Sequence, residues 1–153
     1  MRNYILIIYV FLILSGCTNS TSDDVGWFQK KSEAIEYGLK QENIKSDDIV
    51  GEININGDIF VVFKHGKTDK FTVGVSNVAQ KDHKYKWIRS SSLVEISDKV
   101  SVNFFTESNS GNEYEFYIGL SQGRGAKINT NEGEIFPIID PNTNIYYYII
   151  FKK

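Results

Sequence analysis

The sequence predicts an α+β fold made mostly of antiparallel β-strands, with one short N-terminal helix followed by seven to nine strands. Residues 32–42 carry apolar residues at helical spacing, whereas from residue 49 onward apolar and polar residues alternate with the period of two that is typical of strands. Asn56-Gly57 separates the first two alternating segments, as in an antiparallel hairpin. Hydrophobic residues make up 41% of the 153 residues, which is enough for a packed core.

The first element is an apolar segment, Tyr4 to Leu14, that follows the basic residue Arg2. Its length is typical of the hydrophobic region of a signal peptide, about 7–15 residues. It falls short of the roughly 20 residues that span a bilayer as a helix, and the polar residues 18–24 prevent its extension. The segment ends in Leu14-Ser15-Gly16-Cys17, which resembles the lipobox of bacterial lipoproteins.

The resemblance to lipoproteins implies that residues 1–16 are removed as a signal peptide and that Cys17 becomes a lipid-modified N-terminus. In that family the thiol receives a diacylglyceryl group. Two acyl chains of the palmitate type anchor a protein stably, because each buried CH₂ contributes about 0.8 kcal/mol. We therefore expect lipidation at Cys17 and a location on the extracytoplasmic face of the cell membrane. The alternative is an ordinary secretory signal in which Cys17, the single cysteine of the chain, is incidental.

A tether and a helix are expected next. Residues 17–26 are polar and lack periodicity, which indicates a flexible linker. The helix is expected over residues 32–42, with Ser32 as its N-cap and Glu33 in the first turn, where the helix dipole favours anions. Gly38 weakens the helix by about 1 kcal/mol relative to alanine. The apolar stripe that packs on a sheet consists of Ala34, Ile35 and Leu39.

Four strands follow the helix. A strand near residues 49–55 and another over 59–63 flank Asn56-Gly57, and this dipeptide favours a type I′ turn, in which both central residues adopt positive φ. The strand over 59–63 is apolar on both faces, so we expect it at the centre of its sheet. The third and fourth strands are expected over 71–76 and 85–89, separated by a polar turn at 80–83.

A second β-rich half begins near Leu93. Its strands are expected over 100–104, 113–120, 126–129, 134–139 and 145–151. Pro137 confines one of them to a sheet edge or a bulge, because proline cannot donate a hydrogen bond to a neighbouring strand. The chain can be divided near residues 90–98 into a helix-plus-β module, 27–92, and an all-β module, 93–153. One continuous domain over 27–153 is the alternative.

Three short stretches of the folded part resemble small lipoproteins of low-GC Gram-positive bacteria. They are Glu33-Ala34-Ile35-Glu36-Tyr37-Gly38-Leu39, Val73-Gly74-Val75 and Tyr85-Lys86-Trp87-Ile88-Arg89-Ser90-Ser91. This resemblance agrees with the lipobox, and it brings no activity with it.

The sequence contains no motif that points to catalysis, a metal or a cofactor. His65 and His83 lie in polar turns, without a second histidine or a cysteine at zinc-ligand spacing. Ser76 follows Gly74 but lacks the second glycine of a nucleophile elbow. Residues 140–151 begin like a calcium loop but carry isoleucine and phenylalanine where glycine and glutamate are required. We therefore predict no catalytic residue, no metal and no cofactor.

Glu113 and Glu115 lie on one face of an expected strand, as a pair of acid/base carboxylates would. Because the alternate positions are apolar, a solvated strand face is the better interpretation. We expect both carboxylates to lie in water.

Two weak surface-binding candidates remain. Lys84 and Lys86 share one face of the fourth strand and are placed to meet anionic lipid or a wall polymer. Tyr146 and Tyr148 share one face of the last strand, with Tyr147 on the other, so one of the two faces is a candidate aromatic binding surface. Ordinary solvated and packed strand faces are the alternatives for both pairs.

The first functional hypothesis is a non-enzymatic lipoprotein whose β-rich domain binds an envelope protein or polymer. The second is an envelope hydrolase or transferase with a site assembled from distant residues, which a pocket joining His65 or His83 to a carboxylate and a hydroxyl would favour. The third is an inhibitor or immunity-type partner of a secreted enzyme. Removing Arg2 with the signal leaves 16 basic and 19 acidic residues, a balance that does not indicate nucleic acid as a partner.

Overall fold

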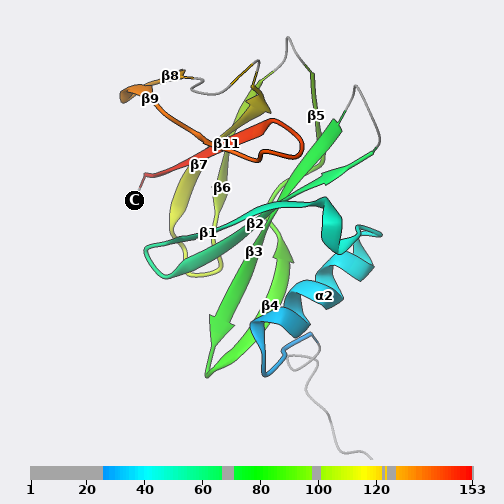
Figure 1. Cartoon of the computed structure of the whole chain (residues 1–153). Coiled ribbons are helices and arrows are strands. Elements are labelled where there is room, and N and C mark those ends of the chain that lie inside the picture. The colour runs from blue at the N-terminus through cyan, green and yellow to red at the C-terminus, as the bar shows by residue number, and fades with distance from the viewer. Residues whose placement is uncertain (1–25, 67–70, 98–100, 122, 124–126, 153) are drawn as a thin grey trace, which may run out of the picture.

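The computed structural model describes residues 26–66, 71–97, 101–121, 123 and 127–152. Within these ranges the chain forms one α-helix and eleven strands, and every paired strand is antiparallel (Figure 1). The predicted α+β class is confirmed, although the strands outnumber the seven to nine expected. The predicted signal peptide, Cys17 and the tether up to residue 25 lie outside the described residues.

The first sheet has the order β1-β2-β3-β4, with β5 also paired to β3. The helix α2 and a short 3₁₀ turn η2 precede this sheet in the chain. The bounds of these elements are α2 Lys31–Gln41, η2 Ser46–Asp48, β1 Ile49–Ile55, β2 Asp58–His65, β3 Phe71–Lys81, β4 Lys84–Arg89 and β5 Val94–Ile96.

The second sheet has the order β10-β11-β7-β6, and β8 and β9 form a separate hairpin. The bounds are β6 Val102–Glu107, β7 Glu113–Leu120, β8 Ile128–Thr130, β9 Gly133–Ile135, β10 Ile138–Ile139 and β11 Ile145–Phe151. The strand expected over 134–139 is thus split in two, and the break includes Pro137, which cannot donate a ladder hydrogen bond.

The predicted β1–β2 hairpin is confirmed. Ile55 pairs with Asp58, and the two residues between them, Asn56 and Gly57, have φ values of 51° and 85°. Positive φ at both positions is the condition for a type I′ turn. Asp82 and His83 form an equivalent two-residue turn between β3 and β4, with φ values of 49° and 61°. This second turn is shorter than the expected one, so β3 continues to Lys81.

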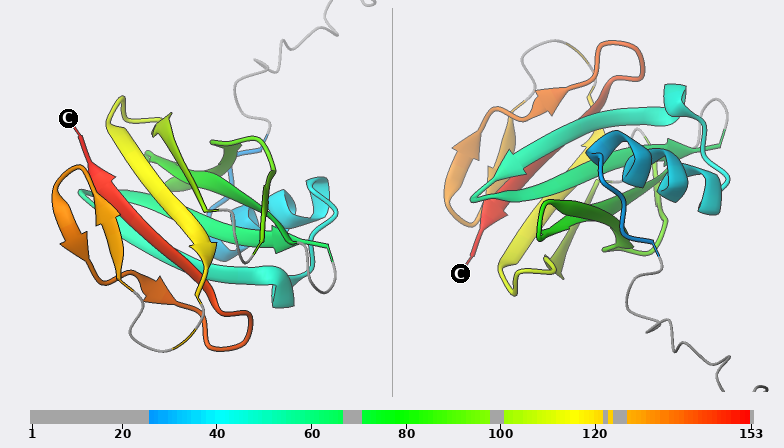
Figure 2. Two further views of the ribbon diagram at one scale, coloured as in Figure 1. Left: turned by 90° about the horizontal axis from the view of Figure 1, so that it is seen from above. Right: turned by 90° about the horizontal axis from the view of Figure 1, so that it is seen from below.

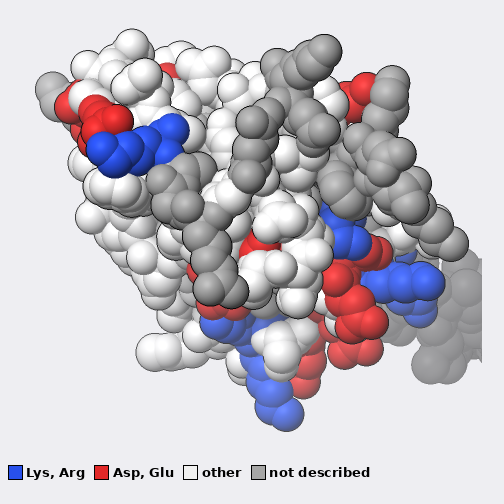
Figure 3. All heavy atoms as spheres, turned by 45° about the horizontal axis from the view of Figure 1, so that its top comes forward, with Lys and Arg blue, Asp and Glu red and all other residues white. Residues whose placement is uncertain are grey.

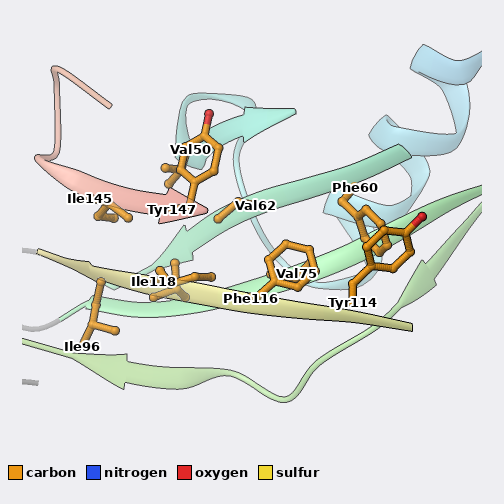
Figure 4. Close-up of a cluster of buried hydrophobic side chains, with 11 residues drawn as sticks. Val50, Phe60, Val62, Val75, Ile96, Tyr114, Phe116, Ile118, Ile145 and Tyr147 are labelled. Atoms are coloured by element: carbon orange, nitrogen blue, oxygen red, sulfur yellow. The ribbon is translucent and has the colours of Figure 1, made fainter. Parts of the chain in front are cut away.

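Strand β2 is buried on both faces, as expected for a central strand. On one side, Val61 and Phe63 pack with α2 and with Trp87 of β4. On the other side, Phe60 and Val62 pack with the second sheet (Figure 4). The Phe60 ring centroid lies 4.9 Å from that of Tyr114 and 5.2 Å from that of Phe116. The molecule therefore has the layer order helix, first sheet, second sheet (Figure 2).

The core between the sheets contains side chains from both halves of the chain. Phe60 and Val75 come from the expected 27–92 segment, whereas Phe116 and Tyr147 come from the 93–153 segment. The two segments that the sequence separates near residues 90–98 thus bury their apolar faces against each other.

The helix begins at Lys31, and Lys30 takes the N-cap position without a side-chain cap hydrogen bond. The assignment of Ser32 as N-cap is therefore wrong, because Ser32 already lies inside the first turn. Gly38, which sequence reasoning treats as a weakness, is buried where the helix meets the Trp87 ring. A Cβ atom at this position would overlap the indole, so close approach of the helix to β4 requires glycine here.

This contact predicts that Gly38→Ala destabilises the protein even though alanine is the better helix former. The propensity gain is about 1 kcal/mol, whereas overpacking typically costs about 1–3 kcal/mol. Because the added Cβ would lie 2.0 Å from the Trp87 ring, the cost here falls in the upper part of that range, about 2–3 kcal/mol. We expect a net loss of about 1–2 kcal/mol in the free energy of unfolding, measured in urea by tryptophan fluorescence. The exposed Gln41→Ala is the matched control and should change it by less than about 0.5 kcal/mol. A Gly38→Ala variant more stable than the parent would contradict the packing argument.

Candidate functional site

A cleft of about 1420 Å³ lies beside α2. One wall is the helix, and the others are the segment from Asn43 to Ile49 and the end of β2. We call it the α2 cleft. Its apolar lining consists of Ile35, Leu39, Ile44 and Ile49.

Local structure at the end of the helix forms this cleft. Asn43 follows the last turn with φ of 55°, the left-handed conformation that commonly terminates helices. The Ile44 amide then donates to the Leu39 carbonyl at 2.8 Å, and the Ile44 side chain is buried against the helix. The chain therefore turns back beside α2, and η2 leads it into β1.

The rim of the α2 cleft carries charges of both signs. Lys64 and Asp48 form an ion pair at 2.5 Å. Burial raises the pKa of the Asp48 carboxyl, but the hydrogen bonds and charges of Lys64 and Lys45 together outweigh burial, so this pKa lies below its ordinary value. The remaining charged lining residues are Glu36, Asp47, Lys40 and Lys45, with His65 beside them. On the molecular face seen in Figure 3, acidic and basic side chains likewise lie next to each other in mixed groups.

A second polar centre surrounds Asp58, the first residue of β2. Its Oδ2 accepts hydrogen bonds from Tyr114 Oη at 2.7 Å and from Ser108 Oγ and Asn112 Nδ2 at 2.9 Å, and its Oδ1 accepts one from Ser110 Oγ at 2.7 Å. These five residues, which we call the Asp58 clasp, join the first sheet to the β6–β7 loop. Sequence reasoning missed them, because the serines and asparagines read only as a polar loop.

The clasp explains two opposite pKa shifts. Burial raises the pKa of the Asp58 carboxyl, but the hydrogen bonds from Asn112, Tyr114, Ser110 and Ser108 together outweigh burial and hold it below its ordinary value. Burial and the hydrogen bond to Asp58 raise the pKa of Tyr114 to about 12. At neutral pH the centre is therefore a carboxylate surrounded by neutral donors.

A cleft of about 580 Å³ adjoins the clasp and is lined by Asp58, Ser110, Asp82 and His83. This is the combination of a histidine, a carboxylate and a hydroxyl that the enzyme hypothesis requires. However, the Ser110 hydroxyl donates to Asp58, and none of the hydrogen bonds among the described residues joins His83 to Ser110. An activated nucleophile needs a base within hydrogen-bond reach. The one base that Ser110 reaches in the described residues is the Asp58 carboxylate, whose lowered pKa makes it a weak proton acceptor.

The expectation that Glu115 lies in water is wrong. Its side chain is 0% exposed, and it accepts hydrogen bonds from Tyr117 at 2.8 Å and Asn103 at 3.2 Å. Lys152 lies 2.9 Å from the other carboxylate oxygen and also pairs with Glu132, which lies between β8 and β9. The β8–β9 hairpin thus covers this outer face of the second sheet. Burial raises the pKa of Glu115, but Lys152, Tyr117 and Asn103 outweigh burial and lower it.

The structure places the four surface candidates on two different sheets. Lys84 and Lys86 are half-buried on β4, and the Lys86 ammonium lies 5.9 Å from the centroid of the Trp27 ring. Tyr146 is 8% exposed and packs over Gly119, while Tyr148 is half-buried on the same face of β11. Cys17, the predicted lipidation residue, lies outside the described residues.

The described part of the chain offers neither a metal-binding cluster nor a membrane-spanning helix. It contains no group of three or more His, Cys, Asp or Glu side chains arranged to hold a metal ion. None of its helices has both the length and the apolar character needed to cross a membrane. Compared with known proteins, the chain matches no family model, no curated protein and no solved structure.

The Asp58 clasp predicts a pH-dependent contribution to stability. A carboxyl whose pKa is lower in the folded state than in the unfolded state, about 3.9, stabilises the fold above that value, and the stabilisation is lost as pH falls through the folded-state pKa. We expect Asp58→Asn to lower the free energy of unfolding by about 1–3 kcal/mol at pH 7. The difference from the parent should shrink below about pH 4.

Urea unfolding at pH 7 and at pH 3 would measure this difference. Asp82→Asn, which removes an exposed carboxylate from the neighbouring turn, is the matched control and should have little effect at either pH. A difference between parent and Asp58→Asn that is equally large at both pH values would contradict the role of the charge.

Proposed function

We propose that this chain is a lipoprotein anchored through lipid on Cys17 to the extracytoplasmic face of the cell membrane, and that its β-rich domain binds another envelope component without catalysis. The observation that carries the proposal is the order and spacing of three features along the chain. They are the basic residue Arg2, the apolar run Tyr4 to Leu14 and the residues Ser15-Gly16-Cys17. Each part has the length and position that a lipoprotein signal requires.

The α2 cleft supports binding of a protein segment over binding of an anionic polymer. Apolar walls with a few polar groups are typical of ligand sites, because burial supplies affinity and polar groups supply orientation. Here Glu36 and Asp47 lie on the same rim as Lys40 and Lys45. A uniformly anionic polymer would be attracted by the lysines and repelled by the carboxylates, whereas a protein segment can present both charges.

Two alternatives relate to this proposal in different ways. An inhibitor or immunity-type role is the case in which the bound protein is a secreted enzyme. An envelope hydrolase or transferase would need a catalytic group, and the cleft beside His83 has its serine hydroxyl directed to Asp58. The geometry therefore favours a binding role.

The anchor predicts that Cys17→Ser abolishes incorporation of a radiolabelled or clickable fatty acid in the producing cell. The hydroxyl cannot accept the thioether-linked diacylglyceryl group that the resemblance implies, so the variant should be released or remain unprocessed. Labelling of the parent and of Ser20→Ala, a change outside the box, should be equal. A Cys17→Ser chain that is labelled and membrane-bound like the parent would refute the anchor.

The α2 cleft predicts that a bulky residue on its lining prevents partner capture. Ser46 is exposed and lines the cleft, so Ser46→Trp should fill part of it without disturbing the core. Ser92, which is exposed outside the clefts described above, provides the matched control Ser92→Trp.

Cross-linking in membranes followed by pull-down would compare the three proteins. We expect one protein to be recovered with the parent and with Ser92→Trp, and at least about tenfold less of it with Ser46→Trp, since a loss of 1.4 kcal/mol in binding has that effect. Equal recovery with Ser46→Trp would exclude this cleft. Turnover of an envelope substrate by the purified parent would refute the non-enzymatic role.

A further inference from the structure

We infer that the face from which the tether enters the domain rests on the anionic surface of the membrane itself. This inference builds on the proposed lipid anchor, and it names the surface that the folded domain meets. The root face, as we call it, is the end of the molecule where α2 begins and where the β3–β4 turn lies, and it includes side chains from both sides of β4. The residues that matter here are Trp27, Tyr37, Lys81, Lys84 and Lys86.

The entry point of the chain is fixed on this face. Phe28 and Tyr85 exchange two backbone hydrogen bonds of 2.8 Å, so the start of the described chain is held against β4. Trp27 and Phe28 point to opposite sides of this bridge: Trp27 lies over Lys86, and Phe28 packs with the helix-side core. The start of α2 and the β3–β4 turn lie at the same end of the molecule (Figure 1).

The length of the tether keeps the root face close to the bilayer. Eight residues lie between Cys17 and Gly26, which makes nine residue-to-residue steps. A fully extended chain gains at most about 3.3–3.6 Å per step, or about 30 Å in all. A tether of this length gives the root face an effective concentration at the surface in the millimolar range. Weak contacts with lipid headgroups are therefore sufficient to orient the domain.

The aromatic residues of the root face suit the interface between water and lipid. Trp27 is half-buried, and Tyr37 is 39% exposed, with its ring centroid 5.1 Å from that of Phe28. Tryptophan and tyrosine favour the headgroup region, because their rings are apolar and each carries a polar group. The tether thus emerges beside aromatic side chains that the fold leaves partly open to solvent.

The charge of the root face complements anionic lipid. Lys30 and Glu33 form an ion pair at 3.7 Å, and the other charged residues of this end are Lys81, Lys84, Lys86 and Asp82. The root face is therefore positive, although the whole chain is negative. Lysines near an anionic leaflet each strengthen association about fivefold. Asp23 and Asp24 of the tether oppose this attraction, which makes the lysines of the folded face the residues to test.

The test uses the mature protein purified from the producing cell and mixed with two kinds of vesicle, phosphatidylcholine alone and an equal mixture with phosphatidylglycerol. Flotation of the protein with the vesicles measures whether the lipid anchor holds it on the membrane. Quenching of tryptophan fluorescence by lipid that is spin-labelled near the headgroup measures contact between the root face and the lipid surface. Trp27 lies on this face, whereas Trp87, the other tryptophan, is buried. Trp27→Phe should remove the quenched component.

We expect stronger quenching on the anionic vesicles, and we expect added salt to remove the difference. Lys86→Gln should weaken the association of the root face with the anionic vesicles about fivefold. Lys81→Gln, which removes a charge without changing a contact of Trp27, should weaken it by the same factor. The matched control is Lys127→Gln, because Lys127 also lies over an aromatic ring, 5.2 Å from the centroid of Phe136, but outside the root face.

Each remaining outcome decides between the two proposals. A protein that floats with both vesicles but is quenched equally on both, with no effect of Lys81→Gln, overturns the seated root face and leaves the anchor intact. A protein that floats with neither kind of vesicle overturns the lipid anchor, and the seated root face with it. Loss of quenching in Lys127→Gln to the same degree as in Lys86→Gln would also overturn the assignment, since net charge alone would then be responsible.

Discussion

Burial of β2 on both faces is the constraint on which the rest of the structure depends. Val61 and Phe63 provide the surface on which α2 packs, and Phe60 and Val62 provide the surface on which the second sheet packs. A slip of one residue in the pairing of β2 would exchange these two sets. The type I′ turn at Asn56-Gly57 fixes that register, so a local backbone preference determines which layer each side chain meets.

Two buried carboxylates then hold neighbouring segments together, Asp58 between the two sheets and Glu115 within the second sheet. Asp58 joins the start of β2 to the β6–β7 loop through neutral donors, and Glu115 joins the outer face of the second sheet to Lys152 through an ion pair. A buried carboxylate without partners would be costly, so each must be satisfied within the fold. The partners of Asp58 and Glu115 thus explain both buried carboxylates by structural roles.

The sequence predicts the elements whose cause is local. The Asn56-Gly57 hairpin and the last strand, Ile145–Phe151, appear where expected, because turn preference and alternation act between neighbours. Interactions between distant residues account for the rest. Glu115 reads as solvated until the β8–β9 hairpin covers it, and Asp58 meets partners some fifty residues away in the sequence. Gly38 reads as a weak helix position until the Trp87 ring is placed against it.

For the candidate sites too, the sequence predicts what depends on neighbouring residues and not what depends on distant ones. The proposed lipobox is a contiguous motif, so the sequence alone suffices to propose Cys17 as the lipidation residue, whereas the α2 cleft depends on the chain folding back at Asn43. The helix connects the two proposals, because it begins beside the root face and lines the α2 cleft from Ser32 to Lys40. Eleven residues at 1.5 Å each give a helix of about 16 Å, which is short compared with the tether. A partner that enters the cleft while the root face rests on lipid must itself come within this distance of the membrane, so we expect it to be a membrane-associated or envelope-bound protein.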